Sequence, residues 1–562
     1  MKKFFTCVLL VTSFVASIFA DVDYKVRVIP ASKTFAVSMQ LSSAKATEVI
    51  RIPAWCPGFY FLLDYEKRLS DFVALDPKGQ RLAVRKVDSR GFLVENPNQT
   101  PITVNYRMLG NDTGLGFFRT HIRSSIAFIN GPGLFMFAED RLDEKCSVEF
   151  QLPDSWDIAS PMTAGGKGKF VADGYDEFVD HPFQLGKFIR RNFEVEKIPF
   201  EVIWVADPAP ACNVDVETER LKKASIPAIK LFGGAPFKKY TYFVHLEVGD
   251  FNGGLEHRAS NVIAVANTAT IHLDDLATHE YFHAWNVKQI RPKILGPFDY
   301  RSPQRTSNLW FSEGVTDYYA KMHAYQAGFF SESQLLSSLE NMIEELEMSQ
   351  TAKRLTLEQV SKQTWENGGF GVDDLSYYTK GLVIGLLFDA HLRGDSDGKQ
   401  SLDDLLRKCF KQFALPEPGF EENDIRSLLK EMEPKQTPKL YDLMVRSTGA
   451  MPYELLKNLG LRLMVPGTSY LEPRYAVNSN FVVTNVANGG ADDVRIGDQI
   501  ISALPNENDK ITVKLLRENK TMTVTVKGKR FVAGDYRLRR NPFATKEQRQ
   551  RFDEWLAGST PK

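Results

Sequence analysis

Two histidines four residues apart, His279 and His283, constrain this 562-residue chain more than any other feature of its sequence. Positions i and i+4 lie on one face of a helix, so the two imidazoles can bind a single metal ion. Glu280 follows the first histidine directly, where it can reach a water beside that ion without binding the metal itself. The flanking residues are largely apolar, which favours a buried helix. Because the H-E-x-x-H pattern also recurs by accident, a third ligand is needed to establish a metal site.

A catalytic zinc site needs three protein ligands and one open position for water. The best third ligand is Glu313, in a second helical stretch that reads NLWFSEGVTDYYA. Asp317 lies four residues further on the same face and can accept a hydrogen bond from the outer N–H of a ligating histidine. The neighbouring side chains are mostly aromatic or apolar, which argues against an exposed acidic face. We therefore predict one Zn²⁺ per chain, held by His279, His283 and Glu313, with Glu280 as general base.

These two motifs resemble those of the glycyl aminopeptidases, a family of thermolysin-like zinc peptidases whose third ligand is a glutamate. The resemblance rests on THEYFHAWNVKQIRP followed by LWFSEGVTDYY. Here 29 residues, positions 284 to 312, separate His283 from Glu313, against about 18–19 in thermolysin and the large aminopeptidases. The longer spacing suits the glycyl aminopeptidases. The resemblance implies a zinc-dependent aminopeptidase that acts on peptides with a free N-terminus and prefers small first residues, Gly or Ala.

Two further stretches supply residues that the resemblance places at the substrate. In NGGLEHRASN, Gly253 and Gly254 let the backbone approach a ligand closely. The resemblance implies that Glu256, which follows them, holds the α-amine of the substrate and so limits cleavage to the first peptide bond. In LSYYTKG, Tyr378 resembles the tyrosine that donates a hydrogen bond to the reacting oxyanion. Tyr377 is the adjacent alternative.

The pattern of strands and helices predicts a multidomain α+β protein. Residues 21–192 carry short strands rich in Val, Ile, Phe and Tyr, typical of an antiparallel β-sandwich. Residues 193–460 begin with strands, around 200–270, and continue with helical periodicity, which includes the segment 439–459 and a capping signature SESQ at 331–334. This is the region that the resemblance identifies as a thermolysin-like catalytic domain. Residues 461–535 return to strands, and residues 536–562 form a tail with one short amphipathic helix.

The segment 461–535 is similar to a PDZ domain. The similarity rests on FVVTNVANGGADDVRIGDQIISAL, in which a strand leads to a turn of small residues and then to G-D-x-I, with Gly497 and Asp498 in that last element. PDZ domains bind extended peptides along an exposed sheet edge. The module can therefore recruit a peptide or protein ligand, or it can pack against the catalytic domain, and both interpretations stay open.

The first twenty residues contain two lysines followed by an uncharged apolar run, the layout of a secretory signal peptide, residues 1–20. An N-terminal membrane anchor is the alternative. We expect an exported protein, periplasmic or secreted, with no stable membrane insertion after the signal is removed, because no later stretch is long and apolar enough. Four widely spaced cysteines remain and allow either disulfides or free thiols: Cys56, Cys146, Cys212 and Cys409.

The balance of charged residues argues against one class of partner. Basic and acidic residues number 70 each, so no net charge attracts nucleic acid, which is a poor candidate partner.

One rival function is an endopeptidase on the same zinc scaffold. A second, of another class, is a PDZ-type scaffold or chaperone with a degenerate peptidase body. Another divalent metal also stays open, although two imidazoles and one carboxylate with an open position suit zinc best.

Overall fold

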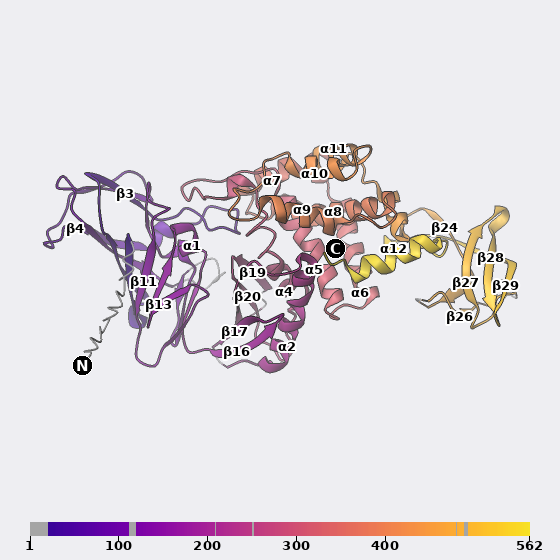
Figure 1. Ribbon diagram of the computed structural model, residues 1–562, viewed down its shortest axis with the longest axis horizontal. Helices are drawn as coiled ribbons and strands as arrows, with labels where there is room; N and C mark the ends of the chain where they lie inside the picture. Colours follow the sequence, from indigo (N-terminus) through magenta and orange to yellow (C-terminus); the bar gives the residue numbers. More distant parts are fainter. Residues whose placement is uncertain are drawn as a thin grey trace, which may run out of the picture.

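The structure is a computed structural model that describes residues 21–111, 120–207, 209–249, 252–478, 480–487 and 493–561. The expected signal peptide lies outside the described residues. Figure 1 shows an elongated molecule with a β-rich N-terminal region at one end, a helical region in the middle and a small β module at the other end. No helix in the described part of the chain is long and apolar enough to cross a membrane.

The N-terminal region is a β-rich domain whose described strands form three sheets. Alternation of buried and exposed side chains, as along β1, turns one face of each strand toward a core. The largest sheet has the order β13-β14-β11-β1-β2-β7-β4. Its strands are β1 (Val22–Ile29), β2 (Thr34–Leu41), β4 (Leu69–Leu75), β7 (Ile102–Leu109), β11 (Cys146–Gln151), β13 (Thr163–Gly166) and β14 (Lys169–Ala172).

Two four-stranded sheets complete this domain, in the orders β10-β3-β6-β5 and β12-β15-β9-β8. One pairing departs from the predicted antiparallel pattern, because β1 and β11 run parallel. They are far apart in the sequence, so no hairpin turn forces them to be antiparallel. The remaining elements are β3 (Thr47–Arg51), β5 (Val84–Lys86), β6 (Gly91–Glu95), β8 (His121–Ile122), β9 (Ile126–Ile129), β10 (Phe137–Ala138), β12 (Asp157–Ala159), β15 (Phe183–Gly186) and helix α1 (Tyr175–Val179).

A five-stranded sheet of order β16-β17-β18-β20-β19 follows. Strands β17, β18 and β20 run parallel, whereas β19 turns back antiparallel to β20 and forms one edge. That edge is free to face a ligand. The elements are β16 (Ile189–Val195), β17 (Ile198–Ala206), α2 (Val214–Ala224), α3 (Ile226–Phe232), β18 (Tyr240–Glu247), β19 (Asn252–His257) and β20 (Ser260–Ala266).

Helices form the rest of the middle region. Helix α6 begins with the predicted capping box, in which the side chains of Ser331 and Gln334 bond each other's backbone N–H. The helix predicted over 439–459 is interrupted after Arg446, and a 3₁₀ turn resumes at Tyr453. The elements are α4 (Asp274–Phe282), a π-helical turn (Trp310–Gly314), α5 (Val315–Gln326), α6 (Glu332–Met348), α7 (Leu357–Gln363), β21 (Gly371–Val372), β22 (Leu375–Ser376), α8 (Tyr377–Asp395), α9 (Leu402–Phe413), α10 (Asp424–Met432) and α11 (Thr437–Arg446).

The C-terminal module consists of small sheets around a core that includes Ile511, Val513 and Leu515. Residues 488–492 of the PDZ-like run lie outside the described residues, so the PDZ assignment stays a prediction. The strand pairs are β23 (Leu461–Met464) with β31 (Arg537–Arg540), β24 (Ser469–Glu472) with β30 (Lys529–Val532), and β25 (Tyr475–Val477) with β26 (Val483–Val486); a three-stranded sheet contains β27 (Gln499–Pro505), β28 (Lys510–Arg517) and β29 (Lys520–Lys527).

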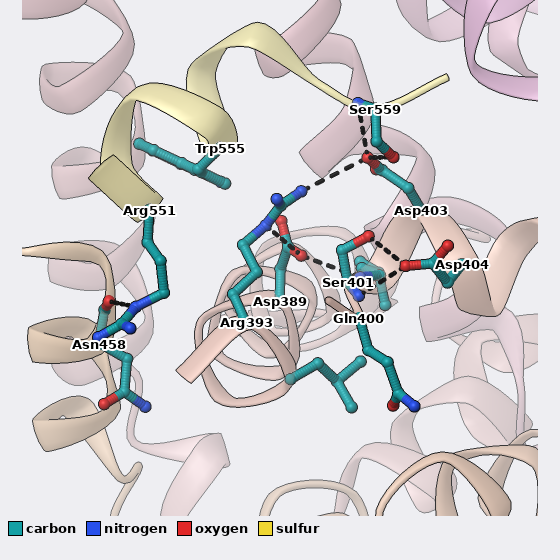
Figure 2. A network of polar contacts seen from close by, with 12 residues as sticks. Asp389, Arg393, Gln400, Ser401, Asp403, Asp404, Asn458, Arg551, Trp555 and Ser559 are labelled. Carbon is teal, nitrogen blue, oxygen red and sulfur yellow. Dashed lines mark hydrogen bonds and ion pairs between the residues drawn. The ribbon is translucent and has the colours of Figure 1, made fainter. Parts of the chain in front are cut away.

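The tail returns to the helical region through α12 (Lys546–Ala557), as Figure 1 shows. Beyond this helix, Ser559 donates from its backbone N and its Oγ to Asp403 Oδ2, at 3.1 and 2.6 Å. Arg393 lies between Asp403 and Asp389, with N–O distances of 3.4 and 2.9 Å (Figure 2). The segment that follows α12 is thus hydrogen-bonded to a buried network of charged side chains in the helical region.

Candidate metal centre and substrate cleft

Hydrogen bonds fix the rings of the two histidines. His279 Nδ1 lies 3.2 Å from Asp317 Oδ1, and His283 Nδ1 lies 2.7 Å from the carbonyl oxygen of Asn286. Both partners are acceptors, so each ring is assigned its proton on Nδ1. The lone pairs of the two Nε2 atoms then face each other at 3.0 Å.

Glu313 adds a third acceptor to this pair. Its Oε2 lies 3.2 Å from His283 Nε2 and 3.7 Å from His279 Nε2, and all three side chains are buried. Buried acceptors that converge in this way are stabilised by a positive charge between them, either a metal ion or a proton on one of the imidazoles. Ligand atoms arranged tetrahedrally at about 2.0–2.1 Å from zinc lie roughly 3.3 Å apart, so the observed spacings fit one such ion.

A local irregularity of the helix presents Glu313 to the histidines. The residue lies in the π-helical turn Trp310–Gly314, a wide turn of the kind often found at functional sites. The side-chain amide of Asn286 donates to the carbonyl oxygen of Phe311 at 2.8 Å and to Thr316 Oγ1 at 3.1 Å. The segment that follows α4 is thereby joined to the turn that carries the third acceptor.

Two glycines bring a second helix close to this turn. A Cβ on Gly314 would lie 2.5 Å from Gly381 Cα, and a Cβ on Gly381 would lie 2.6 Å from the carbonyl oxygen of Trp310. The two backbones can approach this closely only because neither position carries a side chain. The crossing places the first turn of α8, which contains Tyr378, beside the metal centre.

Glu280 lies between the metal centre and the edge strand β19. Its carboxyl group packs against Gly254, where any Cβ would overlap it. Burial raises the pKa of Glu280 to about 7, against the opposing effect of His279 and His283. A carboxylate with a pKa in this range can take up and release a proton near neutral pH.

Glu256 comes from the same strand and is only 3% exposed. Its Oε1 has no hydrogen-bond partner among the described residues and lies 3.6 Å from Lys288 Nζ. Lys288 is itself held by Asp180 of the N-terminal domain, at 3.0 Å. The carboxylates of Glu256 and Glu280 and a ring nitrogen of His283 form a second cluster of possible metal ligands, within 4.8 Å of one another. The Nδ1 of His283 is bonded to the Asn286 carbonyl, so only its Nε2 is available, and that atom already faces Glu313.

The two candidate tyrosines differ in their surroundings. Tyr377 is fully buried, and its hydroxyl donates to the carbonyl oxygen of Gly369 at 2.6 Å. Tyr378 is less buried and lines a cleft, with its ring 6.0 Å from that of His279. The geometry therefore favours Tyr378 as the hydroxyl that can meet a substrate.

The metal centre has a large open cleft on one side and a small cavity on the other. An open cleft of about 470 Å³ runs past His279 and Glu280, and the start of β19 forms one of its walls. On the side of Glu256 the structure leaves a cavity of only about 30 Å³, bordered by Gly58 and Tyr60 of the N-terminal domain. The site is therefore open in one direction and nearly closed in the other.

Comparison with known proteins identifies the family of this chain. The model of the Peptidase M61 N-terminal domain matches residues 23–187, and the model of the M61 glycyl aminopeptidase matches residues 272–384. The chain belongs to the M61 glycyl aminopeptidase family. The second match includes both histidines, Glu313 and the start of α8. This M61 chain is a peptidase of the zinc aminopeptidase class.

Solved structures share the fold of this M61 peptidase. An aminopeptidase N family protein from Idiomarina loihiensis has a TM-score of 0.75 and 23% identity, over 95% of this chain and 100% of that chain. An M1 zinc metallopeptidase from Deinococcus radiodurans has a TM-score of 0.51 and 16% identity, over 77% and 94%. A mutant of the latter bound to a Tyr-Ser-Ala substrate has a TM-score of 0.50. A search of the curated proteins found no match.

Several residues of the M61 site were not predicted from the sequence. Asn286 and Lys288 lie inside the quoted stretch HAWNVKQIRP, where a lysine among apolar neighbours was a usable signal. Asp180 and Tyr60 come from the N-terminal domain, far from the zinc motifs in sequence. No local pattern connects them to the metal centre.

Proposed function

We propose that this M61 peptidase is a zinc-dependent aminopeptidase that releases small N-terminal residues, Gly or Ala, from peptides. The nearly closed side of the site, at Glu256, carries this proposal. A free α-ammonium would pair with the buried Oε1 of that carboxylate, which has no hydrogen bond among the described residues and lies 3.6 Å from Lys288 Nζ. The cavity there is far smaller than the open cleft on the other side, about 30 Å³ against about 470 Å³. So small a space would suit a hydrogen atom or a methyl group better than a large side chain.

The ligand set proposed for zinc is His279, His283 and Glu313. Asp317 and the Asn286 carbonyl would keep both imidazoles in the tautomer that binds a metal through Nε2. Zinc bound there would supply Lewis-acid chemistry to the scissile carbonyl. We propose one ion per chain, because the second cluster of close ligand atoms among the described residues, Glu256, Glu280 and His283, shares its only histidine with the first.

Protein side chains would move the protons of the reaction. Glu280 would accept a proton from the attacking water and deliver it to the leaving amine, a role that its pKa of about 7 supports. The hydroxyl of Tyr378 would donate to the oxyanion that forms from the substrate carbonyl. The backbone at Gly253 and Gly254, on the free edge of β19, would align the extended substrate in the open cleft.

Two proposals concern the ends of the chain. Lysines followed by an apolar run in residues 1–20 support export to the periplasm or the medium. The G-D-x-I element of residues 461–535, with Gly497 and Asp498, supports a PDZ-like module that binds a peptide or protein ligand. N-terminal sequencing of the mature protein and peptide-array binding to the intact protein would test them.

A panel of dipeptides tests the proposed activity. Gly-Phe, Ala-Phe, Leu-Phe and N-acetyl-Gly-Phe are compared with and without a chelator, and with zinc added back. We expect hydrolysis of Gly-Phe and Ala-Phe, little hydrolysis of Leu-Phe and none of the acetylated peptide, with activity lost to the chelator and restored by zinc. Equal cleavage of blocked internal peptides would instead support an endopeptidase, and absence of hydrolysis by the zinc-loaded protein would support a scaffold.

A further inference from the structure

One loop of the N-terminal domain, residues 55–60, reaches the metal centre. Tyr60 is 2% exposed, and its hydroxyl donates to Glu313 Oε1 at 3.1 Å across 253 residues of sequence. The other oxygen of that carboxylate, Oε2, is the one that faces the histidines. The tyrosine therefore fixes the oxygen that points away from the metal position and leaves one oxygen for the ion.

The loop packs against the catalytic domain. Trp55 donates from Nε1 to the carbonyl oxygen of Asp299 at 2.9 Å, and its ring packs edge-on against Trp365 at 5.1 Å. The ring of Tyr60 packs against Trp365 and Tyr377. These aromatic contacts help to hold the ring in the orientation in which its hydroxyl meets Glu313.

The same loop touches the second carboxylate of the site. Gly58 has φ +93°, a conformation that favours glycine, and a Cβ there would lie 2.6 Å from Glu256 Oε2. The loop backbone thus packs directly on the carboxylate proposed to hold the substrate amine. Residues 58 and 60 contact Glu256 and Glu313 respectively, and so set the spacing between the two groups.

We propose that the loop 55–60 is a positioning element of the active site, in which Tyr60 orients Glu313 for the metal and Gly58 leaves room for Glu256. The inference rests on the zinc aminopeptidase proposed above. It makes the N-terminal domain a part of the metal centre: an outer partner of a ligating carboxylate is supplied by a different domain from the ligands. Such outer partners typically contribute 10- to 100-fold to metal affinity.

Zinc affinity without substrate tests the role of Tyr60. The variant Tyr60→Phe keeps the ring and removes the hydroxyl, and Tyr24→Phe is its control, because Tyr24 donates a buried hydroxyl to Met136 O in the same domain, away from the site. We expect the zinc dissociation constant, measured by competition with a chromophoric chelator, to rise 10- to 100-fold in Tyr60→Phe and to stay unchanged in Tyr24→Phe. Unfolding temperatures of the metal-free proteins show whether either variant is misfolded.

A second variant separates positioning from general support of the fold. Gly58→Ala should raise the KM for Gly-Phe at least tenfold while zinc affinity stays within twofold of the parent. In Tyr60→Phe the fold-loss of zinc affinity should exceed any change of the KM measured at saturating zinc. Wild-type zinc affinity in Tyr60→Phe, or the same combined loss of zinc and substrate affinity in both variants, would overturn the proposal. A protein that binds zinc as expected but hydrolyses no dipeptide would instead refute the proposed function and leave the role of Tyr60 standing.

Discussion

His279 and His283 present their Nε2 atoms to each other at 3.0 Å, while each Nδ1 is committed to an acceptor elsewhere. The two lone pairs and the Glu313 carboxylate repel one another unless a metal ion or a proton lies between them, and Glu313 accordingly raises the pKa of His283 against the effect of burial. Folding therefore builds an arrangement that is costly without metal, and metal binding should stabilise the folded state.

The first prediction concerns the stability of the metal-free protein. At a free zinc concentration about 1,000 times the dissociation constant, a single site stabilises the fold by about 4 kcal/mol. Calorimetry before and after chelation should show a lower unfolding temperature that zinc restores and magnesium does not. Equal unfolding temperatures with and without zinc would contradict a metal site at this position.

The two adjacent tyrosines should respond differently to loss of the hydroxyl. Tyr378→Phe should lower kcat about 10²- to 10³-fold, because the oxyanion loses a donor. Tyr377→Phe removes a buried bond to the Gly369 carbonyl and should cost about 1 kcal/mol of stability, with kcat nearly unchanged. Steady-state kinetics and denaturant unfolding measure both effects. The assignment fails if Tyr377→Phe is the variant that loses kcat.

Helix α8 offers a matched pair of glycines. Gly381→Ala should destabilise the protein by about 1–3 kcal/mol, because its Cβ would lie 2.6 Å from Trp310 O. Gly385→Ala is the control: its Cβ would meet Tyr318 at an ordinary 3.4 Å, and alanine is a better helix former by about 1 kcal/mol. Urea unfolding of the zinc-loaded proteins measures the difference. Equal stability of the two variants would refute the close helix crossing.

Acid should destabilise the protein in part through a buried histidine. Burial lowers the pKa of His323 to about 3, against the opposing effect of Asp403. The unfolded chain, with an ordinary pKa near 6.5, binds a proton there below that pH while the folded protein does not. This contribution to stability is present above pH 6.5 and is lost as the pH falls toward 3.

The variant His323→Gln should therefore lose less stability than the parent between pH 7 and pH 4.5, by roughly 2 kcal/mol. Replacement of the exposed His272 by Gln serves as the control and should leave the pH dependence as in the parent. Guanidinium unfolding at the two pH values measures the change. A parental pH dependence in His323→Gln would show that this side chain does not contribute.

Helical spacing predicted two pairs of side chains, and the need of a catalytic zinc for a third ligand predicted that the two pairs meet. His279 and His283 share a helix face, Asp317 lies one turn beyond Glu313, and the structure brings all four together. Their catalytic and ligand roles stay predictions until they are measured. The family resemblance supplied Glu256 and Tyr378, which no spacing rule connects to the histidines.

Other parts of the fold were predicted incompletely because local patterns conflict. The region 200–270 read as strands, yet it contains α2 and α3; the signal overlooked was Asn213, whose side chain caps α2 by accepting from two backbone N–H groups. The helix predicted over 439–459 breaks near Gly449 and Pro452, two residues that disfavour a continuous helix. The contact between Tyr60 and Glu313 joins two domains, and such contacts have no local sequence signature.

The variant Glu280→Gln tests the central claim most directly, because it removes the proposed general base and leaves the three proposed ligands in place. Metal analysis and hydrolysis of Gly-Phe are measured on the same preparation, with the parent protein alongside. The account predicts one zinc per chain in both proteins and a kcat about 10²- to 10⁴-fold lower in the variant. Full turnover by a zinc-loaded Glu280→Gln protein would contradict it.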